Sequence, residues 1–424
     1  MRNDLGLLRE RRFALLFGAR TCSTLGSAIG PVALAFGVLG LPGATPARLS
    51  AVLTVYSICQ VAFMLLGGAI ADRWPRQRLM VVAEAGSTVA WGAIAVMFVV
   101  GRAPLEPLLL LSAAAGTATA LFFPALAGVV PEVVPAARLQ SANALLRLGT
   151  NAARLSGFAV AGALVALVGP GWGLMVNAAS FAVSGALLAA LRLPRVPRDG
   201  GGSHIVADLR DGWREFSSRQ WLWVVVVQFS FMVAATQAAY GVLGPVVAKA
   251  ELGGAPAWSA ILGAQAVGMM AGVFVAVRLR PRRPILVATL WTLLYALPPA
   301  LLGLRAPLWA VVAGSFLCGV GFDVFGVLWE TTMQRTIPAS ALSRVSSYDW
   351  LGSLLLGPLG LLAAGPLAVT VGTHASLVGC AVVTLVAAAA ALLSPGVRRL
   401  EWPALPADSG TPAPTTGAAT DVRA

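Results

Sequence analysis

Long apolar runs, each sufficient for a membrane crossing, dominate the chain of 424 residues. A helix of about 20 apolar residues crosses the hydrocarbon core of a bilayer. Charged residues, proline and glycine separate the runs. We therefore predict an all-α integral membrane protein with twelve transmembrane helices near residues 13–39, 49–71, 79–100, 107–130, 141–168, 172–191, 220–247, 257–278, 285–303, 308–331, 344–370 and 373–393.

The composition excludes an ordinary soluble protein. Only 11% of the residues are charged, 58% are apolar, and Lys249 is the single lysine, whereas a soluble domain is about 25% charged. The formal charge of +13 does not indicate a nucleic-acid partner, because the charges form short blocks between the apolar runs. The four cysteines lie inside apolar runs without a CxxC pair, so we expect no metal site and no cofactor.

The basic residues predict the topology. With the N-terminus in the cytoplasm, 23 of the 30 basic residues fall in interior segments and four in exterior loops. Cytoplasmic loops of membrane proteins carry an excess of Lys and Arg. The pattern predicts a multi-pass membrane protein with an even number of spans and both termini cytoplasmic.

The chain divides into four predicted segments. These are an N-terminal six-helix bundle at 1–191, a cytoplasmic linker at 192–219, a C-terminal six-helix bundle at 220–394 and a disordered cytoplasmic tail at 395–424. In the linker, Leu209, Trp213 and Phe216 alternate with Arg210 and Arg214, which predicts an amphipathic helix on the inner leaflet.

The two bundles repeat each other in sequence. An offset of 203 residues pairs Gly169 with Gly372, and an offset of 204 pairs Gly68 with Gly272. Tandem six-helix repeats indicate two pseudo-symmetric bundles related by an axis along the membrane normal, with the substrate path between them.

A loop motif stands between the second and third predicted helices. The segment GGAIADRWPRQRLM at 67–80 resembles the loop signature Gly-x-x-x-Asp-Arg-x-Gly-Arg-Arg of the major facilitator superfamily (MFS). The matching positions are Gly68, Asp72, Arg73 and Arg76, whereas Pro75 replaces the second Gly. The segment at 122–145 is similar to bacterial efflux permeases of the drug and siderophore type, which implies a bacterial-type plasma (inner) membrane. With the twelve spans and the repeat, the resemblance covers nearly the whole chain and implies the MFS fold and alternating access.

We interpret the motif as a gating latch. Gly68 allows a neighbouring helix to approach closely, and Asp72 is suited to cap the positive N-terminus of the eleventh helix. Arg73 and Arg76 are suited to bind carboxylates or lipid phosphates, and we expect Asp349 to join this cluster. The alternative is a basic loop that only sets the topology.

Six charged residues lie about 10–20 Å deep in predicted spans, at about 1.5 Å per residue, where charge is costly and usually faces a cavity or a partner. They match in estimated depth as the pairs Arg20 with Glu84, Arg147 with Glu330, and Arg154 with Asp323. The pairs predict a brace within the first bundle and a charged ladder between helices five and ten. A carboxyl removed from water is more readily protonated, so Asp323 is the candidate for a coupling proton, with Arg154 as its competitor. Structural ion pairs that close the inner gate are the alternative.

Polar and aromatic residues near mid-membrane are candidates for the substrate cavity. Interhelical hydrogen bonding is the alternative for the polar ones. The candidates are Gln60, Tyr56, Gln228, Phe231, Tyr240 and Asn151.

These features favour a secondary active transporter rather than an enzyme. We expect proton-coupled efflux of amphipathic small molecules (drug, antibiotic or siderophore-like), because an apolar cavity with few fixed charges suits such ligands. The sequence has no G-x-x-x-x-G-K-[ST] motif, so the energy comes from a gradient. An uptake permease or an uncoupled lipid or metabolite translocator remains an alternative, and a membrane-embedded enzyme a remote one. The expected partners are the bilayer, the substrate and protons, and we expect a monomer.

Overall fold

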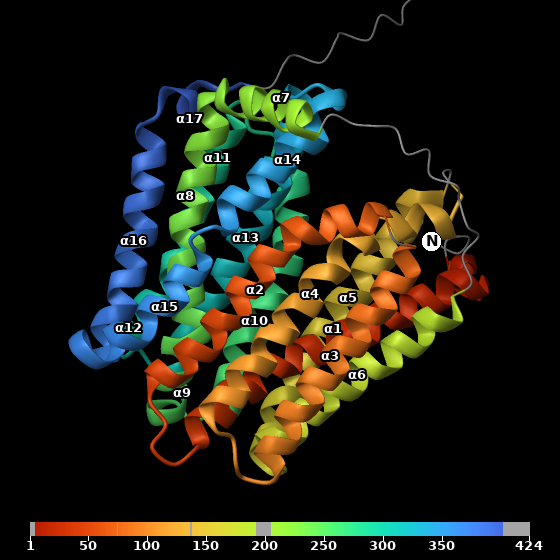
Figure 1. The fold of residues 1–424 in the computed structure, drawn as a ribbon. Helices are drawn as coiled ribbons and strands as arrows, with labels where there is room; N and C mark the ends of the chain where they lie inside the picture. The colour runs from red at the N-terminus through yellow and green to blue at the C-terminus, as the bar shows by residue number, and fades with distance from the viewer. Residues whose placement is uncertain (1–4, 74, 136–137, 192–204, 402–424) are drawn as a thin grey trace, which may run out of the picture.

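The computed structural model describes residues 5–73, 75–135, 138–191 and 205–401, and the regular elements in these ranges are all helical (Figure 1). Within them, the side chains of a few stretches, including 65–73, lie outside the described part. Within the described residues, eleven helical stretches are long and apolar enough to cross a membrane. The last of these, Arg344–Leu393, has 50 residues and turns at Gly372, so it makes two crossings.

The first half of the chain forms one bundle. After the short helix η1 (Leu5–Arg9), its elements are α1 (Arg11–Gly40), α2 (Pro46–Arg73), α3 (Arg76–Val99), α4 (Leu105–Val133), α5 (Leu139–Leu167) and α6 (Pro170–Ala190). A shorter helix, α7 (Ile205–Ser217), precedes the second bundle.

The second half uses more, shorter elements for its crossings. They are α8 (Gln220–Gln237), η3 (Ala238–Leu243), α9 (Gly244–Glu251), α10 (Ala255–Arg278), α11 (Pro284–Trp291), η4 (Thr292–Ala296), α12 (Leu297–Gly303), α13 (Leu308–Thr336), α14 (Ala339–Leu354), α15 (Gly357–Leu367), η5 (Ala368–Gly372), α16 (Thr373–Leu393) and α17 (Pro395–Arg399). Proline in the first turn begins several of them, where its missing N–H costs no helical hydrogen bond.

The repeat extends to the backbone. Gly169 and Gly372 have φ of +95° and +97° and stand at the start of α6 and α16. Glycine adopts this conformation at little cost. Gly116 in α4 and Gly319 in α13, again 203 residues apart, both lie against a backbone oxygen of the neighbouring helix. The two bundles therefore share turn and packing geometry.

The two bundles meet at one end of the molecule. We call the end that carries α7 and α17 the α7 end, and the end of the turns after α1 and α9 the opposite end (Figure 1). At the opposite end, one apolar core includes buried residues of both halves, such as Leu34 and Leu361. Toward the α7 end, each half has a separate core, around Leu16 and Leu328 respectively. Among the described side chains these two cores do not join, and the helices of the two halves spread apart toward the α7 end in Figure 1.

Direct contacts also hold the opposite end together. Lys249 donates a hydrogen bond to the carbonyl oxygen of Leu39, and Ser50 donates one to that of Leu361. A methyl group placed on Gly365 would lie 2.5 Å from the Cα of Ala47. Small residues at such positions let helices of different bundles pack closely.

Two segments differ from the sequence predictions. In α7, Phe216 is buried and its ring lies 5.9 Å from that of Tyr348 in α14, so the apolar face of α7 packs on protein as well as on any lipid. Residues 395–399, predicted to be disordered, form α17 because Val397 is buried and Gln220 accepts a hydrogen bond from the Gly396 N–H. Residues 402–424 lie outside the described part.

Candidate functional site

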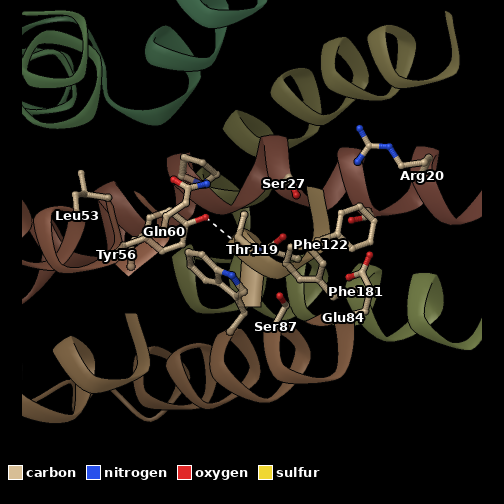
Figure 2. A pocket seen from close by; sticks show the side chains of 15 residues that line it. Arg20, Ser27, Leu53, Tyr56, Gln60, Glu84, Ser87, Thr119, Phe122 and Phe181 are labelled. Carbon is tan, nitrogen blue, oxygen red and sulfur yellow. Dashed lines mark hydrogen bonds between the residues drawn. The ribbon is translucent and has the colours of Figure 1, made fainter. Parts of the chain in front are cut away.

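A cavity of about 290 Å³ lies inside the first bundle (Figure 2). We call it the N-half pocket. Helices α1, α2, α3, α4 and α6 all contribute to its wall. Its lining residues are Arg20, Ser23, Ser27, Pro31, Leu34, Leu53, Tyr56, Gln60, Glu84, Ser87, Trp91, Thr119, Phe122, Asn177 and Phe181. Of these, Ser27 and Pro31 are exposed and mark the mouth of the pocket.

Glu84 lies deep in this pocket. Its side chain comes from α3 and is 2% exposed, and the Ser184 hydroxyl of α6 donates a hydrogen bond of 2.7 Å to its carboxyl. Ser23 of α1 also interacts with it. Glu84 thus lines the pocket while it is held by hydroxyls of α1 and α6.

The predicted brace between Arg20 and Glu84 is not a direct ion pair. Both side chains line the N-half pocket, as the depth estimate suggested, but among the described side chains no ion pair within 4.0 Å joins them. The guanidinium carbon of Arg20 lies 5.7 Å from the centre of the Phe122 ring, and Figure 2 shows it apart from the Glu84 carboxyl. Matched depth places two side chains at the same level along the membrane normal. Whether they touch depends on how each helix is rotated about its own axis.

Asn177 in α6 is a further polar residue of the pocket. Its side chain is 1% exposed, and no described donor reaches its Oδ1 atom. A buried acceptor of this kind normally has a partner. The sequence shows an asparagine at mid-membrane but does not tell whether it faces the pocket, so Asn177 was absent from the predicted cavity.

Two predicted cavity residues do lie in the N-half pocket. Tyr56 and Gln60 line it from α2, and the Tyr56 hydroxyl bonds the Thr119 hydroxyl of α4 at 3.1 Å (Figure 2). The sequence missed the aromatic wall on the other helices, formed by Trp91, Phe122 and Phe181.

The predicted cavity residues of the second half lie elsewhere. Gln228 is buried and donates a 2.9 Å hydrogen bond to Thr292, which supports the interhelical alternative. Phe231 is 49% exposed and lines a groove of about 720 Å³ between α8 and α16. Tyr240 packs against Trp258 at 5.8 Å in the core shared by both halves. The structure therefore does not bring Gln60 and Gln228 to one cavity.

The charged ladder faces the divergent, α7 side of the molecule. Arg147, Asn151 and Arg154 are exposed along one face of α5. On α13 of the other half, Asp323 is half-buried and Glu330 is exposed. Arg147 and Arg154 interact electrostatically with Asp323 across the halves, and the ion pairs found among the described side chains do not include them. The ladder is thus a set of facing charges rather than closed ion pairs.

The loop motif is described in part. Gly68, Asp72 and Arg73 belong to the last turns of α2, but their side chains lie outside the described residues. Arg76 begins α3 and forms a 3.1 Å ion pair with Glu132 of α4, within the same bundle.

Asp349 is engaged within its own half. The indole N–H of Trp329 in α13 donates a 3.0 Å hydrogen bond to its Oδ2 atom. This contact ties α14 to α13, and any contact with Asp72 lies outside the described side chains.

Comparisons with known proteins agree with this architecture. The sequence profile described as Major Facilitator Superfamily matches residues 13–349. Two proteins of Bacillus subtilis (strain 168) match most of the chain. The uncharacterized MFS-type transporter YkuC is 23% identical over 84% of this chain and 87% of its own length. The uncharacterized MFS-type transporter YfiS is 24% identical over 89% and 90%, respectively.

Solved structures share the fold at low identity. An auto-inhibited POT family peptide transporter matches 94% of this chain and 99% of its own, with a TM-score of 0.76 and 13% identity. A bacterial homolog of the human lysosomal transporter Spinster, inward-facing and unoccupied, matches 90% and 96% with a TM-score of 0.70 and 17% identity. These likenesses confirm the predicted all-α fold.

Proposed function

Because the chain belongs to the major facilitator superfamily and is therefore a membrane transporter rather than an enzyme, we propose that it exports amphipathic small molecules in exchange for protons. The observation that carries this proposal is Asp323, a half-buried acid within a membrane span that interacts with Arg147 and Arg154 of the other half. A proton on Asp323 would weaken that attraction. Protonation would then change the balance between open and closed arrangements of the α7 end.

The orientation follows from charge. Described basic residues of the interior segments, such as Arg138, Arg219 and Arg398, lie at the α7 end, so we assign this end to the cytoplasm and both termini to the same side of a bacterial plasma membrane. Reporter tags at Gly43 and Gly200 test the assignment: detection on opposite sides of the membrane supports it, and detection on one side contradicts it.

The transport experiment uses everted membrane vesicles. A proton gradient should drive accumulation of a lipophilic dye, and a protonophore should abolish it. Accumulation that is independent of the gradient would favour an uncoupled translocator, and gradient-driven movement in the opposite direction would favour an uptake permease. Asp323→Asn should lose gradient-driven transport, whereas Glu106→Gln, an exposed acid at the start of α4, serves as the control.

The latch role of the loop motif is a separate part of the proposal. If Asp72 with Gly68, Arg73 and Arg76 stabilises the closed α7 end, Asp72→Asn should slow transport sharply while membrane insertion stays normal. A normal transport rate in this variant would leave the loop with a topological role alone.

A further inference from the structure

The second bundle carries a groove between α8 and α16, two helices that lie side by side (Figure 1). We call it the α8–α16 groove. Both helices belong to membrane-spanning stretches, and the exposed side chains of the wall are mostly apolar, so its surroundings in a bilayer are lipid. The lining residues are Gln220, Trp223, Val224, Val227, Gln228, Phe231, Val382, Val383, Val386, Ala387, Ala390, Ala391, Leu393 and Ser394.

The groove has the length of one leaflet. Gln220 at the start of α8 and Leu393 at the end of α16 line it at the α7 end, and Phe231 lines it further along α8. At about 1.5 Å per residue, the stretch from Gln220 to Phe231 is about 16 Å long. This is about half of the hydrocarbon core, which is about 30 Å thick. A single acyl chain that enters from the α7 end would therefore fill it.

The fold itself does not require this groove. The repeat offset of 203 residues places Leu187 and Leu188 of α6 at the positions of Ala390 and Ala391. In the first bundle Leu188 is fully buried, and a methyl group placed on Gly18 of α1 would lie 3.4 Å from the Cδ1 atom of Leu187. Leucines thus fill the equivalent seam between α1 and α6, and alanines leave the seam between α8 and α16 open.

Positive charge lies at the α7 end of the groove. Arg398 and Arg399 of α17 are exposed, and neither enters an ion pair among the described side chains. The acids just before α8 and just after α17, Glu215 and Glu401, each pair with another arginine. The Nη2 atom of Arg398 donates a 2.9 Å hydrogen bond to the carbonyl oxygen of Leu393, a residue of the wall. This bond holds a guanidinium group at the mouth of the groove.

Two neutral donors line the same part of the wall. The Oε1 atom of Gln220 accepts a hydrogen bond from the Gly396 N–H, so its amide NH₂ group is left as a donor on an exposed side chain. Trp223, one helical turn further into the membrane, is 41% exposed, and tryptophan is typical of the membrane–water interface. Guanidinium and N–H groups of this kind bind phosphate oxygens.

We propose that the α8–α16 groove binds one anionic glycerophospholipid of the leaflet at the α7 end, with an acyl chain along the groove and the phosphate against Arg398 and Gln220. Each arginine near a membrane surface favours an anionic lipid by about fivefold, and Arg399 adds to the attraction. The groove shares no residue with the N-half pocket or with the facing charges of α5 and α13. The proposal is therefore independent of the transported substrate and of proton coupling.

Native mass spectrometry of the full-length protein tests this site with two lipids that carry the same acyl chains. They are phosphatidylglycerol, which is anionic, and phosphatidylcholine, which is zwitterionic. We expect the first phosphatidylglycerol to bind at least fivefold more tightly than the first phosphatidylcholine. Ala390→Leu places the residue of the first bundle in the groove and should weaken phosphatidylglycerol at least threefold. Ala389→Leu, an equally exposed neighbour outside the wall, should leave its affinity unchanged.

A second pair of variants tests the role of charge. Arg398→Gln combined with Arg399→Gln should remove the preference for phosphatidylglycerol and leave phosphatidylcholine unaffected. Arg12→Gln, which changes an exposed arginine at the start of α1, should keep the preference.

Three results would overturn the assignment: equal affinity of the two lipids for the parent protein, equal phosphatidylglycerol affinity in Ala390→Leu and Ala389→Leu, or a preference that persists without Arg398 and Arg399. If the double arginine variant does not fold, as judged by thermal unfolding, the two alanine variants decide alone. A dimer that forms in the parent protein and is lost in Ala390→Leu would show that a second copy of the chain covers the groove, and this too overturns the lipid site.

Discussion

The contact between Gly365 and α2 allows a quantitative test of the hinge-like opposite end. A methyl group on Gly365 would lie 2.5 Å from the Cα of Ala47 and 2.7 Å from the Cβ of Ser50, so Gly365→Ala must push α15 away from α2. Overpacking of this kind costs about 1–3 kcal/mol. Since about 1.4 kcal/mol is a factor of ten in an equilibrium, the variant should shift the population toward an open end by about 5- to 150-fold.

Maleimide labelling of Ser259→Cys reports this opening. Ser259 is 5% exposed and packs against Gly162 in the other seam between the halves, formed by α5 and α10. The reporter belongs in a background without the four native cysteines, which are all free. As long as the open form is a minor population, the labelling rate in detergent is proportional to that population. The rate should therefore be higher in Gly365→Ala than in the parent protein.

A matched glycine controls for helix propensity. Gly379 in α16 has open space where a methyl group would stand, so Gly379→Ala should leave the labelling rate unchanged. If Gly365→Ala folds normally and labels at the parental rate, the seam between α2 and α15 does not hold this end closed, and the reasoning fails.

Three further substitutions test individual contacts. Gln228→Leu should change the free energy of unfolding by less than about 1 kcal/mol, because the lost bond to Thr292 is offset by removal of a buried, unbonded amide oxygen; a large drop in ligand affinity would instead restore Gln228 as a substrate contact. Trp329→Phe removes a donor from Asp349 and should lower stability by about 1–3 kcal/mol in thermal unfolding, whereas an unchanged melting temperature would show that this bond contributes little. Phe216→Ala should detach α7 from α14 and speed tryptic cleavage within α7, with exposed Ser217→Ala as control, and equal cleavage rates would contradict the packing.

The sequence predicts the crossings well because apolar length is set by the bilayer and does not depend on tertiary contacts. The helices begin and end within a few residues of the predicted ranges in most crossings, as in α10 and α16. The helix α17 was missed for the opposite reason. Its formation depends on Gln220 and on burial of Val397, which are contacts between distant parts of the chain.

The site was harder to predict because depth and rotation are different quantities. Depth follows from counting residues along a helix, and Arg20 and Glu84, which are matched in depth, both line the N-half pocket. Rotation normally follows from an apolar stripe. In a membrane the face of a helix that contacts lipid is as apolar as the face that packs inside the protein, so no apolar stripe marks the inward face. The sequence therefore could not show that Gln60 faces a pocket and that Gln228 bonds a neighbouring helix.

The asymmetry between the halves has a consequence for coupling. The backbones of the two halves are similar, as the φ angles of Gly169 and Gly372 show. The polar pocket nevertheless lies in the first half, and Asp323 lies in the second. If ligand and proton bind in different halves, neither displaces the other directly. Binding of the proton and binding of the ligand can then influence each other only by changing how the two halves are arranged. This coupling is reciprocal: if the proton changes the affinity for the ligand by some factor, the ligand changes the affinity for the proton by the same factor. The contacts of Gly365 and Gly162, which lie in the seams between the halves, are therefore where a substitution should change coupling without touching either binding group.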